Sequence, residues 1–267
     1  MFKKIFLSVC LFILILVIVS SFIEFKKNNP PAILENIYRA NPELLPKIKP
    51  LSVKEGVYLP GRKLVLGIKY MNIIPIGEAV LSIGKLEKYN GVKVYPLAAE
   101  ATVGKFSEIF YKAKVRVESL VNAQTLLPLL YKEEMYEKGE LNRSKQIEFD
   151  QDRLLMVRDG NIKRKIVPST FDPVSSIFYL RSQDFDAHKS SKIMMISKED
   201  IYVMKTTVLG KNNNIWHLDS SISRLSGSST HGSRFLMWLG ADSNRLPLLI
   251  KVSTKAGPFT ARLIEIK

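Results

Sequence analysis

Cysteine is almost absent from this sequence, and Cys10 is the single cysteine among 267 residues. Because Cys10 lies within an N-terminal apolar run, the remainder of the chain can form no disulfide and supplies no thiolate nucleophile or thiolate zinc ligand. Histidine is scarce too, and His188, His217 and His231 lack the spacing of metal ligands. We therefore expect neither a metal nor a cofactor.

Other signatures of catalysis and phosphate binding are missing. The sequence has no Gly-x-Gly-x-x-Gly run, no Walker motif and no Gly-x-Ser-x-Gly nucleophile elbow. Hydroxyl groups gather around His231 in segment 226–233, but a catalytic Ser–His pair needs a fixed geometry and a third orienting group. A Gly/Ser-rich segment supplies neither. We expect a surface loop there, no catalytic residue, and a protein that is not an enzyme.

Acidic residues are in deficit. The chain has 25 Asp and Glu residues against 40 Lys and Arg residues, which gives a formal net charge of +15. Such a surface attracts anions, such as nucleic acid, anionic lipid headgroups or acidic polysaccharide. The alternative is a Lys-rich surface that only keeps the protein in solution.

The N-terminus carries a long uncharged run, residues 5–23, preceded by Lys3 and Lys4. As a helix this run would span about 28 Å, close to the ~30 Å hydrocarbon core of a bilayer. It is either an uncleaved signal anchor or a signal peptide cut after Ser21. Both place the rest of the chain on the periplasmic side of the inner membrane, because basic residues stay in the cytoplasm. We expect a cell-envelope protein, either anchored in the inner membrane through residues 5–23 or secreted into the periplasm, with no nucleic-acid partner.

Three segments follow from these patterns: 1–27 is the signal anchor or signal peptide, 28–56 is a spacer, and 57–267 is a single antiparallel β domain. The spacer contains five prolines, which interrupt helices. A β domain of this size can bury a core without a disulfide or a metal.

The exported part alternates with a period of two residues. In segment 111–118 apolar side chains alternate strictly with charged ones, and segments 64–70, 216–219 and 248–252 repeat the pattern. This alternation is typical of antiparallel strands with one dry face. We expect further strands at 78–86, 92–102, 129–136, 144–150, 153–158, 193–197, 201–208, 234–239 and 259–266.

Turn signals separate these strands at Asn90-Gly91, at Asp159-Gly160, and within 210–214 and 242–244. The fold class predicted is all-β with one short helix: an antiparallel meander that forms a curved half-barrel or a lipocalin-like barrel, preceded by an N-terminal hydrophobic helix.

One helix is expected near 173–183. Asp172 has the character of an N-cap, and Pro173 suits the first helical position, where it has no hydrogen bond to lose. Val174, Ile177 and Phe178 then share a helical face with Arg181. The helix should pack on the sheet or plug it.

Several motifs in this order point to a known family. They are Leu-Pro-Gly-Arg-Lys-Leu at 59–64, Phe-Asp at 149–150, Asp-Pro-Val-Ser-Ser-Ile-Phe-Tyr-Leu-Arg at 172–181, and Trp-Leu-Gly-Ala-Asp-Ser-Asn-Arg-Leu-Pro at 238–247. Over residues 57–266 the chain resembles the bacterial domain-of-unknown-function family 3108. The resemblance implies an exported β protein without an assigned activity, with a fold similar to lipocalin-like or lipoprotein-carrier half-barrels. Arg62 departs from the family, which usually has an acidic residue there.

Two constellations are ligand-binding candidates: Tyr179 with Arg181 on the helix, and Trp238, Asp242 and Arg245 near the C-terminus. In the functional interpretation, the helix and Trp238 rim a cavity, and Arg181 or Arg245 binds an anionic headgroup. In the structural interpretation, Tyr179 and Trp238 fill the core while Asp242 and Arg245 brace a hairpin.

The sequence thus predicts a non-enzymatic cell-envelope protein that binds a lipid or another amphiphile in the periplasm. The alternative is a membrane-anchored scaffold or interaction protein of an envelope complex, whose partner is an anionic envelope polymer or another protein. An open apolar cavity of at least ~300 Å³ would favour the first hypothesis, and a packed interior the second.

Overall fold

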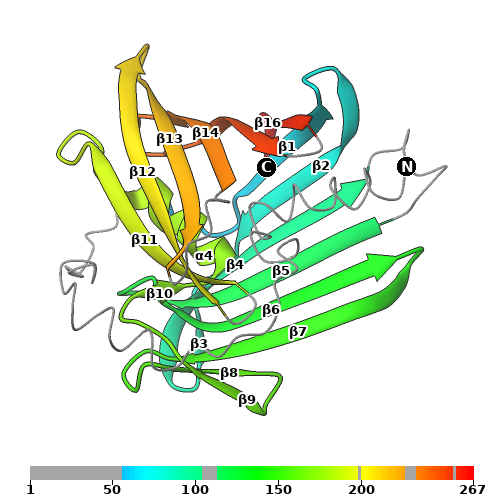
Figure 1. Cartoon of the computed structure of the whole chain (residues 1–267), viewed down its shortest axis with the longest axis vertical. Helices are drawn as coiled ribbons and strands as arrows, with labels where there is room; N and C mark the ends of the chain where they lie inside the picture. Colours follow the sequence, from blue (N-terminus) through cyan, green and yellow to red (C-terminus); the bar gives the residue numbers. More distant parts are fainter. Residues whose placement is uncertain (1–55, 104–112, 198–199, 226–232, 255–256) are drawn as a thin grey trace.

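The computed structural model describes residues 56–103, 113–197, 200–225, 233–254 and 257–267 (Figure 1). The N-terminal apolar run, most of the spacer and most of the hydroxyl-rich segment around His231 lie outside the described residues. Within the described residues, no helix is both long and apolar enough to span a bilayer.

The described chain forms one large sheet and one helix. Its strands are β1 (Lys63–Tyr70), β2 (Ile74–Ile83), β3 (Glu87–Tyr89), β4 (Val92–Val103), β5 (Ala113–Asn122), β6 (Pro128–Glu137), β7 (Glu140–Asp150), β8 (Leu155–Arg158), β9 (Ile162–Lys165), β10 (Thr170–Phe171), β11 (Ser190–Ser197), β12 (Asp200–Asn212), β13 (Ile215–Arg224), β14 (Ser233–Gly240), β15 (Pro247–Thr254) and β16 (Gly257–Ile266). The helix is α4 (Pro173–Ser182). The all-β class with one short helix is therefore confirmed, and the short strands β3, β9 and β10 are additions to the prediction.

The sheet is an open, curved meander. From β1 the order runs through β2, β4 and β5 out to β9, and from the other side of β1 it runs through β16 back to β10. The first and last strands in the sequence, β1 and β16, therefore pair with each other. Strands β9 and β10 follow one another in the sequence but do not pair, so they form the two edges of the sheet. The half-barrel prediction is correct and the closed lipocalin-like barrel is not, because the row of backbone hydrogen bonds is interrupted between β9 and β10.

As expected, alternate side chains of a strand lie on opposite faces of the sheet, one buried and one exposed. On β5, Val115, Val117, Ser119 and Val121 are buried, while residues 114, 116, 118 and 120, which alternate with them, are partly or fully exposed. The buried sets of both halves of the sheet join one hydrophobic cluster, which also contains Ile177 and Phe178 of α4. The concave face is therefore the core face.

Several hairpins in the described part of the chain turn tightly, with positive φ at both central residues. Asn90-Gly91 (φ 47° and 82°) and Asp159-Gly160 (φ 50° and 75°) are turns as predicted. The predicted 210–214 turn is shorter than expected, because β12 continues through a bulge at 208–210 to Asn212 and only Asn213-Asn214 turn the chain. Asn, Asp and Gly tolerate this backbone region at little cost.

Helix α4 begins and ends where its capping residues place it. The Asp172 carboxylate accepts hydrogen bonds from the backbone N–H groups of Val174 (2.7 Å) and Ser175 (3.0 Å), and the backbone N–H of Asp172 donates to Ser175 Oγ (3.0 Å). Every residue of α4 except Tyr179 is buried. Figure 1 shows α4 on the inner side of the curved sheet, where it contacts β4, β5, β10 and β11. The β10–α4–β11 crossover also explains why β10 and β11 are parallel.

Candidate functional site

A charged cluster lies on the concave face of β6 and β7. The Lys145 Nζ and Glu133 Oε2 atoms are 3.5 Å apart, and their side chains are only 6% and 5% exposed. The Tyr131 hydroxyl donates to the same Glu133 oxygen at 3.0 Å, and Lys145 Nζ lies 5.3 Å from the centre of the Tyr131 ring. We call Tyr131, Glu133 and Lys145 the concave charged cluster.

Strand register places these polar groups among apolar ones. Glu133 pairs with Val117 on one side and Lys145 on the other, and Tyr131 pairs with Ile147. Directly paired residues share a face of the sheet, so the ion pair occupies positions where its neighbours are buried apolar side chains. Desolvating two charges costs several kcal/mol per ion, and their mutual attraction often only offsets that cost. Packing alone therefore does not account for a charge pair at these positions.

The surrounding electrostatics are positive. Burial lowers the pKa of Lys145, Glu133 opposes this shift, and the charges of Arg143 and Arg158 add to it. Register places Arg143 opposite Met135 and Arg158 opposite Ile147, on the concave face. Arg158 is also paired with Asp159, whose Oδ2 lies 3.4 Å from its Nε. Around Glu133 the cations Lys145 and Arg143 therefore outnumber the one carboxylate, an arrangement that favours an anion.

The cluster continues toward the N-terminus of α4. Ser119 pairs with Tyr131 across β5 and β6, and its hydroxyl donates to Asp172 Oδ2 at 2.5 Å. Burial raises the pKa of Tyr131 well above its ordinary value, and the negative charges of Glu133 and Asp172 raise it further. Burial also raises the pKa of Asp172, while its hydrogen bonds from Ser119, Ser175 and Val174 oppose the shift. A row of polar groups therefore leads from the helix cap to Lys145.

The sequence-predicted Arg181 clamps the helix to a loop. Its side chain is buried, its Nε donates to the carbonyl of Arg245 at 2.9 Å and its Nη2 to the carbonyl of Asn244 at 3.3 Å. The guanidinium also lies 5.2 Å from the centre of the Phe178 ring. Burial lowers the pKa of Arg181 to about 10, with Tyr58 opposing the shift and Arg62 adding to it.

Arg62, the residue before β1, reinforces the same loop. Its Nη1 donates to the carbonyl of Gly56 at 3.1 Å and to Asn244 Oδ1 at 3.0 Å. Gly56 itself has a φ of 104°, and a Cβ there would lie 2.7 Å from the carbonyl oxygen of Ser243. The arginine that departs from the family pattern therefore has a structural role, tying the start of the described chain to loop 241–246.

Asp242 and Arg245 brace the turn as the structural interpretation expects, but through the Arg245 backbone and not through an ion pair between the two side chains. The buried Arg245 guanidinium stacks on Trp216, 3.9 Å from the ring centre, and burial lowers its pKa while Asp184, Asp186 and Asp242 oppose the shift. Asp242 instead accepts from the backbone N–H of Arg245 at 3.2 Å, which holds the loop in shape. Arg181 and Arg245 thus meet at one loop, through the Arg245 backbone.

Trp238 and Tyr179 lie apart from each other. Trp238 alternates with the buried Met237 and Leu239 and lies on the convex face, where it packs 5.6 Å from His217 and beneath Lys251. Tyr179 is partly buried inside the curve and packs 4.4 Å from Phe171. The structure therefore does not bring Trp238 to the rim of the same cavity as α4, because one strand cannot send Trp238 and Leu239 to one face.

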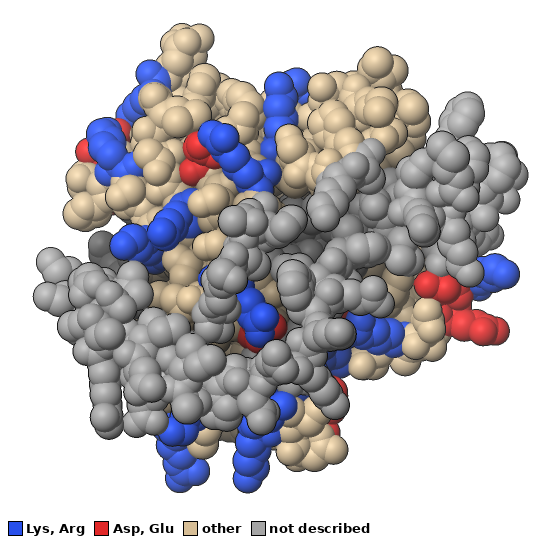
Figure 2. Space-filling model, viewed as in Figure 1, with Lys and Arg blue, Asp and Glu red and all other residues tan. Residues whose placement is uncertain are grey.

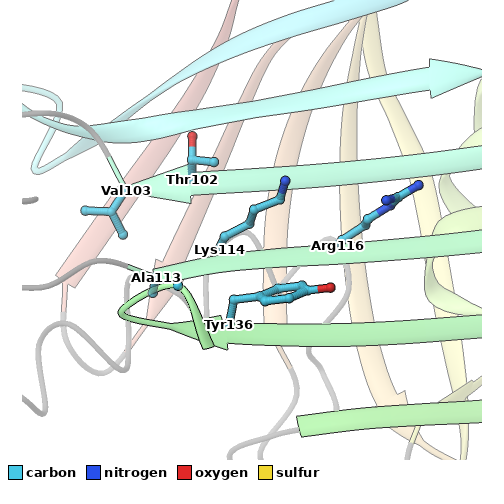
Figure 3. Close-up of a pocket in the computed structure, with 7 residues that line it drawn as sticks. Thr102, Val103, Ala113, Lys114, Arg116 and Tyr136 are labelled. Carbon is cyan, nitrogen blue, oxygen red and sulfur yellow. The ribbon is translucent and has the colours of Figure 1, made fainter. Parts of the chain in front are cut away.

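A hollow of about 500 Å³ lies at the ends of β4, β5 and β6. Its lining is Thr102, Val103, Ala113, Lys114, Arg116, Tyr136 and Gly139 (Figure 3). The polar groups in it are already paired: Lys114 with Glu100 at 2.8 Å, Arg116 with Glu118, and the Tyr136 hydroxyl with Glu134 at 2.8 Å. This hollow is therefore less suited to an anion than the concave charged cluster, and it is not the apolar cavity that lipid carriage would call for.

No group of His, Cys, Asp and Glu with metal-ligand geometry occurs among the described residues. His188 is exposed, and His217 is half-buried against Trp238. The segment around His231 lies outside the described residues, so the expectation of a surface loop there stays a prediction.

Sequence reasoning missed the concave charged cluster, although one signal was present. On β7, Lys145 stands two residues before Ile147 and four before Phe149, so a charge occupies the apolar phase of the strand. On β6, charged residues occur in both of the alternating sets of side chains that point to opposite faces. Only the pairing of Glu133 with Val117 shows which of these sets faces the core. A charged residue in the apolar phase of a strand is the pattern to search for.

Comparisons with known proteins agree with this geometry. A β-barrel-like protein of a domain of unknown function (DUF1849) from Brucella abortus superposes with a TM-score of 0.55 at 7% identity, covering 77% of this chain and 96% of that one. This chain thus has the fold of the β-barrel-like proteins. It belongs to the family described as protein of unknown function (DUF3108), whose model matches residues 67–264.

A second solved structure is more distant. It is a protein described as exported, with a YmcC-like fold, from Bacteroides fragilis, with a TM-score of 0.35 at 9% identity, covering 78% of this chain and 96% of that one. No curated protein matches the sequence.

Proposed function

We propose that this protein is a non-enzymatic protein of the periplasmic side of the cell envelope that binds an amphiphile on its concave face. The observation that carries the proposal is the concave charged cluster, an ion pair at positions that the fold otherwise fills with apolar side chains. A ligand with an anionic headgroup would approach Lys145 and Arg143, and its apolar part would contact the neighbouring aliphatic side chains. This combination of an apolar wall with few polar groups is typical of amphiphile sites.

We propose the concave charged cluster, and not Arg181 as expected from the sequence, as the site that binds the headgroup. Arg181 donates through Nε and Nη2 to loop carbonyls, and its buried Nη1 has no hydrogen-bond partner within the described part of the chain. Lys145 has one ion-pair partner and lies in the field of Arg143 and of Arg158, which is itself paired with Asp159. Charge-assisted hydrogen bonds from such cations to a carboxylate or phosphate are short and strong. We therefore place the headgroup at the strands β6 to β8 and give Arg181 and Arg245 the task of shaping the loop beside α4.

Native mass spectrometry of protein extracted gently from membranes tests the proposal directly. Bound amphiphile should be present on the wild type and depleted on Arg143→Gln and Lys145→Gln. Titration with a fluorescent phospholipid should give a dissociation constant raised at least about tenfold by Lys145→Gln, which is about 1.4 kcal/mol of binding free energy. Lys114→Gln is the matched control, because Lys114 is exposed on the opposite face of the sheet.

Folding defects are separated from binding defects by a paired substitution. Glu133→Leu with Lys145→Met removes both charges, so it should retain stability while losing the ligand. Two results would contradict amphiphile binding at this cluster. One is wild-type protein that never carries a ligand, and the other is a phospholipid affinity equal to that of the wild type in the two single variants, the double variant and the Lys114→Gln control.

The scaffold alternative is favoured by a different observation, the continuous packed cluster that joins both halves of the sheet and α4. A protein with a filled interior would act through an exposed patch. In-cell crosslinking should then retrieve one recurrent envelope partner, and Lys145→Gln should leave that crosslink unchanged. Retrieval of no recurrent partner would count against the scaffold.

A further inference from the structure

The hairpin that joins β1 and β2 ends in an exposed apolar tip. Met71, Ile73 and Ile74 are 49%, 77% and 52% exposed, and the intervening Asn72 and the following Pro75 are exposed as well. Single exposed aliphatic residues are ordinary on a protein surface, but three within four positions at the end of a projecting hairpin are not. Figure 1 shows this hairpin extending beyond the body of the sheet.

We propose that this tip inserts into the interfacial region of an anionic lipid bilayer. The tip comprises Lys69 to Ile76. This contact is independent of the ligand proposed for the concave face, because it uses different residues at the end of different strands.

The tip is held in a fixed shape. Met71 and Asn72 have φ values of 49° and 63°, the tight two-residue turn, and the backbone N–H of Ile73 donates to the carbonyl of Tyr70 at 3.1 Å. On the other side, the backbone N–H of Met71 donates to the carbonyl of Pro258 at 2.8 Å. Met rarely occupies positive φ without a cost. The exposed side chains are therefore presented by a braced turn and not by a frayed end.

The charge of the tip and of the protein surface indicates that the tip would meet an anionic bilayer. Lys69 is the single charged side chain between residues 64 and 77, and it is exposed at the base of the tip. The chain carries a formal net charge of +15, and Lys and Arg side chains outnumber acidic ones on the described part of the face in Figure 2. Apolar side chains bordered by a cation match an anionic leaflet, where the aliphatic groups enter the interface and the ammonium stays among the phosphates.

A neighbouring hairpin reaches the same end of the sheet. Register places the start of β2 beside the end of β4, and the start of β5 beside the end of β6. The β6–β7 hairpin there exposes Leu141 (54%), with one cation, Lys138, and one carboxylate, Glu140, exposed in the same turn. Exposed apolar side chains on two separate hairpins at one rim are consistent with a rim that faces a flat surface.

The test uses the full chain reconstituted into vesicles of phosphatidylcholine with or without phosphatidylglycerol. Cys10→Ser removes the native thiol, and Ile73→Cys carries an environment-sensitive fluorophore. The matched control is Leu86→Cys, an exposed leucine (46%) that follows the far end of β2, about 33 Å away along the strand. Brominated lipids should quench the label at residue 73 at least severalfold more than the label at residue 86, and only in anionic vesicles.

Lys69→Glu should reduce this quenching, and high salt should reduce it as well, because the attraction is screened. Equal quenching at residues 73 and 86 would overturn the proposal. Energy transfer between labelled copies at residue 73, without lipid quenching, would also overturn it and would assign the tip to contact with a second copy. Neither outcome bears on ligand binding at Lys145, so the two proposals fail separately.

Discussion

At the scale of single residues, the core of this protein contains ionisable groups, and only some of them hold the fold. Glu133 and Lys145 pair within a cluster of aliphatic and aromatic side chains, and Asp172 is fully buried at the start of α4. The two cases differ in how completely their polar atoms are satisfied. Asp172 accepts from two backbone N–H groups and two hydroxyls, whereas the Glu133–Lys145 pair leaves further donors of Lys145 for another partner. The first is structural, and the second is the candidate for binding.

We expect the charges of Glu133 and Lys145 to be strongly coupled in stability. Lys145→Met alone should cost about 3–5 kcal/mol, because it leaves a buried carboxylate without a cation, whereas the double variant with Glu133→Leu should lie within about 1–2 kcal/mol of the wild type. Urea unfolding of the four proteins of the cycle measures the coupling. Costs that simply add would show that the two side chains do not interact.

A pH dependence should follow from Asp172. Burial raises its pKa above the ordinary value of 3.8, so the native state holds this proton more tightly than the unfolded state. The stability from protonated Asp172 is therefore fully present below pH 3.8 and is lost as the pH rises through the raised pKa. The difference in unfolding free energy between wild type and Asp172→Asn should change across that window, and a constant difference would contradict the raised pKa.

At the scale of elements, backbone conformation fixes where strands turn and how α4 is held. Tight turns with positive φ link β3 to β4, β6 to β7, β8 to β9 and β12 to β13. Helix α4 is held at its start by the Asp172 cap and at its end by Arg181, which binds the carbonyls of loop 241–246. Both devices act through backbone groups that would otherwise be buried without a partner.

One hairpin turn has a residue type that is unfavourable for its backbone conformation. Lys138 has a φ of 53° before Gly139, in a position where Asn90 and Asp159 stand in two other hairpins. Asn adopts this region at lower cost, so Lys138→Asn should raise the unfolding free energy by about 0.5–1 kcal/mol. Thermal and urea unfolding check this prediction, with Asn90→Lys as the reverse control that should lose a similar amount. A stabilising effect of Asn90→Lys would contradict the argument.

At the scale of the whole molecule, the curved sheet is an open half-barrel, and we call the gap between its edge strands β9 and β10 the seam. The chain's first and last strands pair, and the seam falls between β9 and β10 in the middle of the sequence. An unpaired strand offers free N–H and C=O groups to other chains. Strand β9 carries exposed Lys163, Arg164 and Lys165, which repel a second copy of the same edge.

Removing these charges should therefore promote association. Lys163→Thr, Arg164→Val and Lys165→Thr together should shift the protein to concentration-dependent dimers or larger species in light scattering. A matched triple change on the paired strand β16, at exposed positions, should leave the mass unchanged. A monomeric β9 variant at all concentrations would show that another feature protects this edge.

The local features of this fold could be read from the sequence because they depend on residues close together in the chain. Alternation of apolar and charged side chains predicts the strands, Asn-Gly and Asp-Gly predict the turns, and Asp172-Pro173 predicts the start of α4. Each depends on steric and hydrogen-bonding preferences that act within a few residues.

Tertiary structure alone decided which side chains meet. Whether Glu133 faces the core depends on its pairing with Val117, and a shift of one residue would have sent it to the convex face. The same physics placed Trp238 on the outside, directed Arg181 to a backbone 64 residues away and left the seam between β9 and β10. Register between distant strands is set by the burial of the whole sheet, and no short stretch of sequence contains that information.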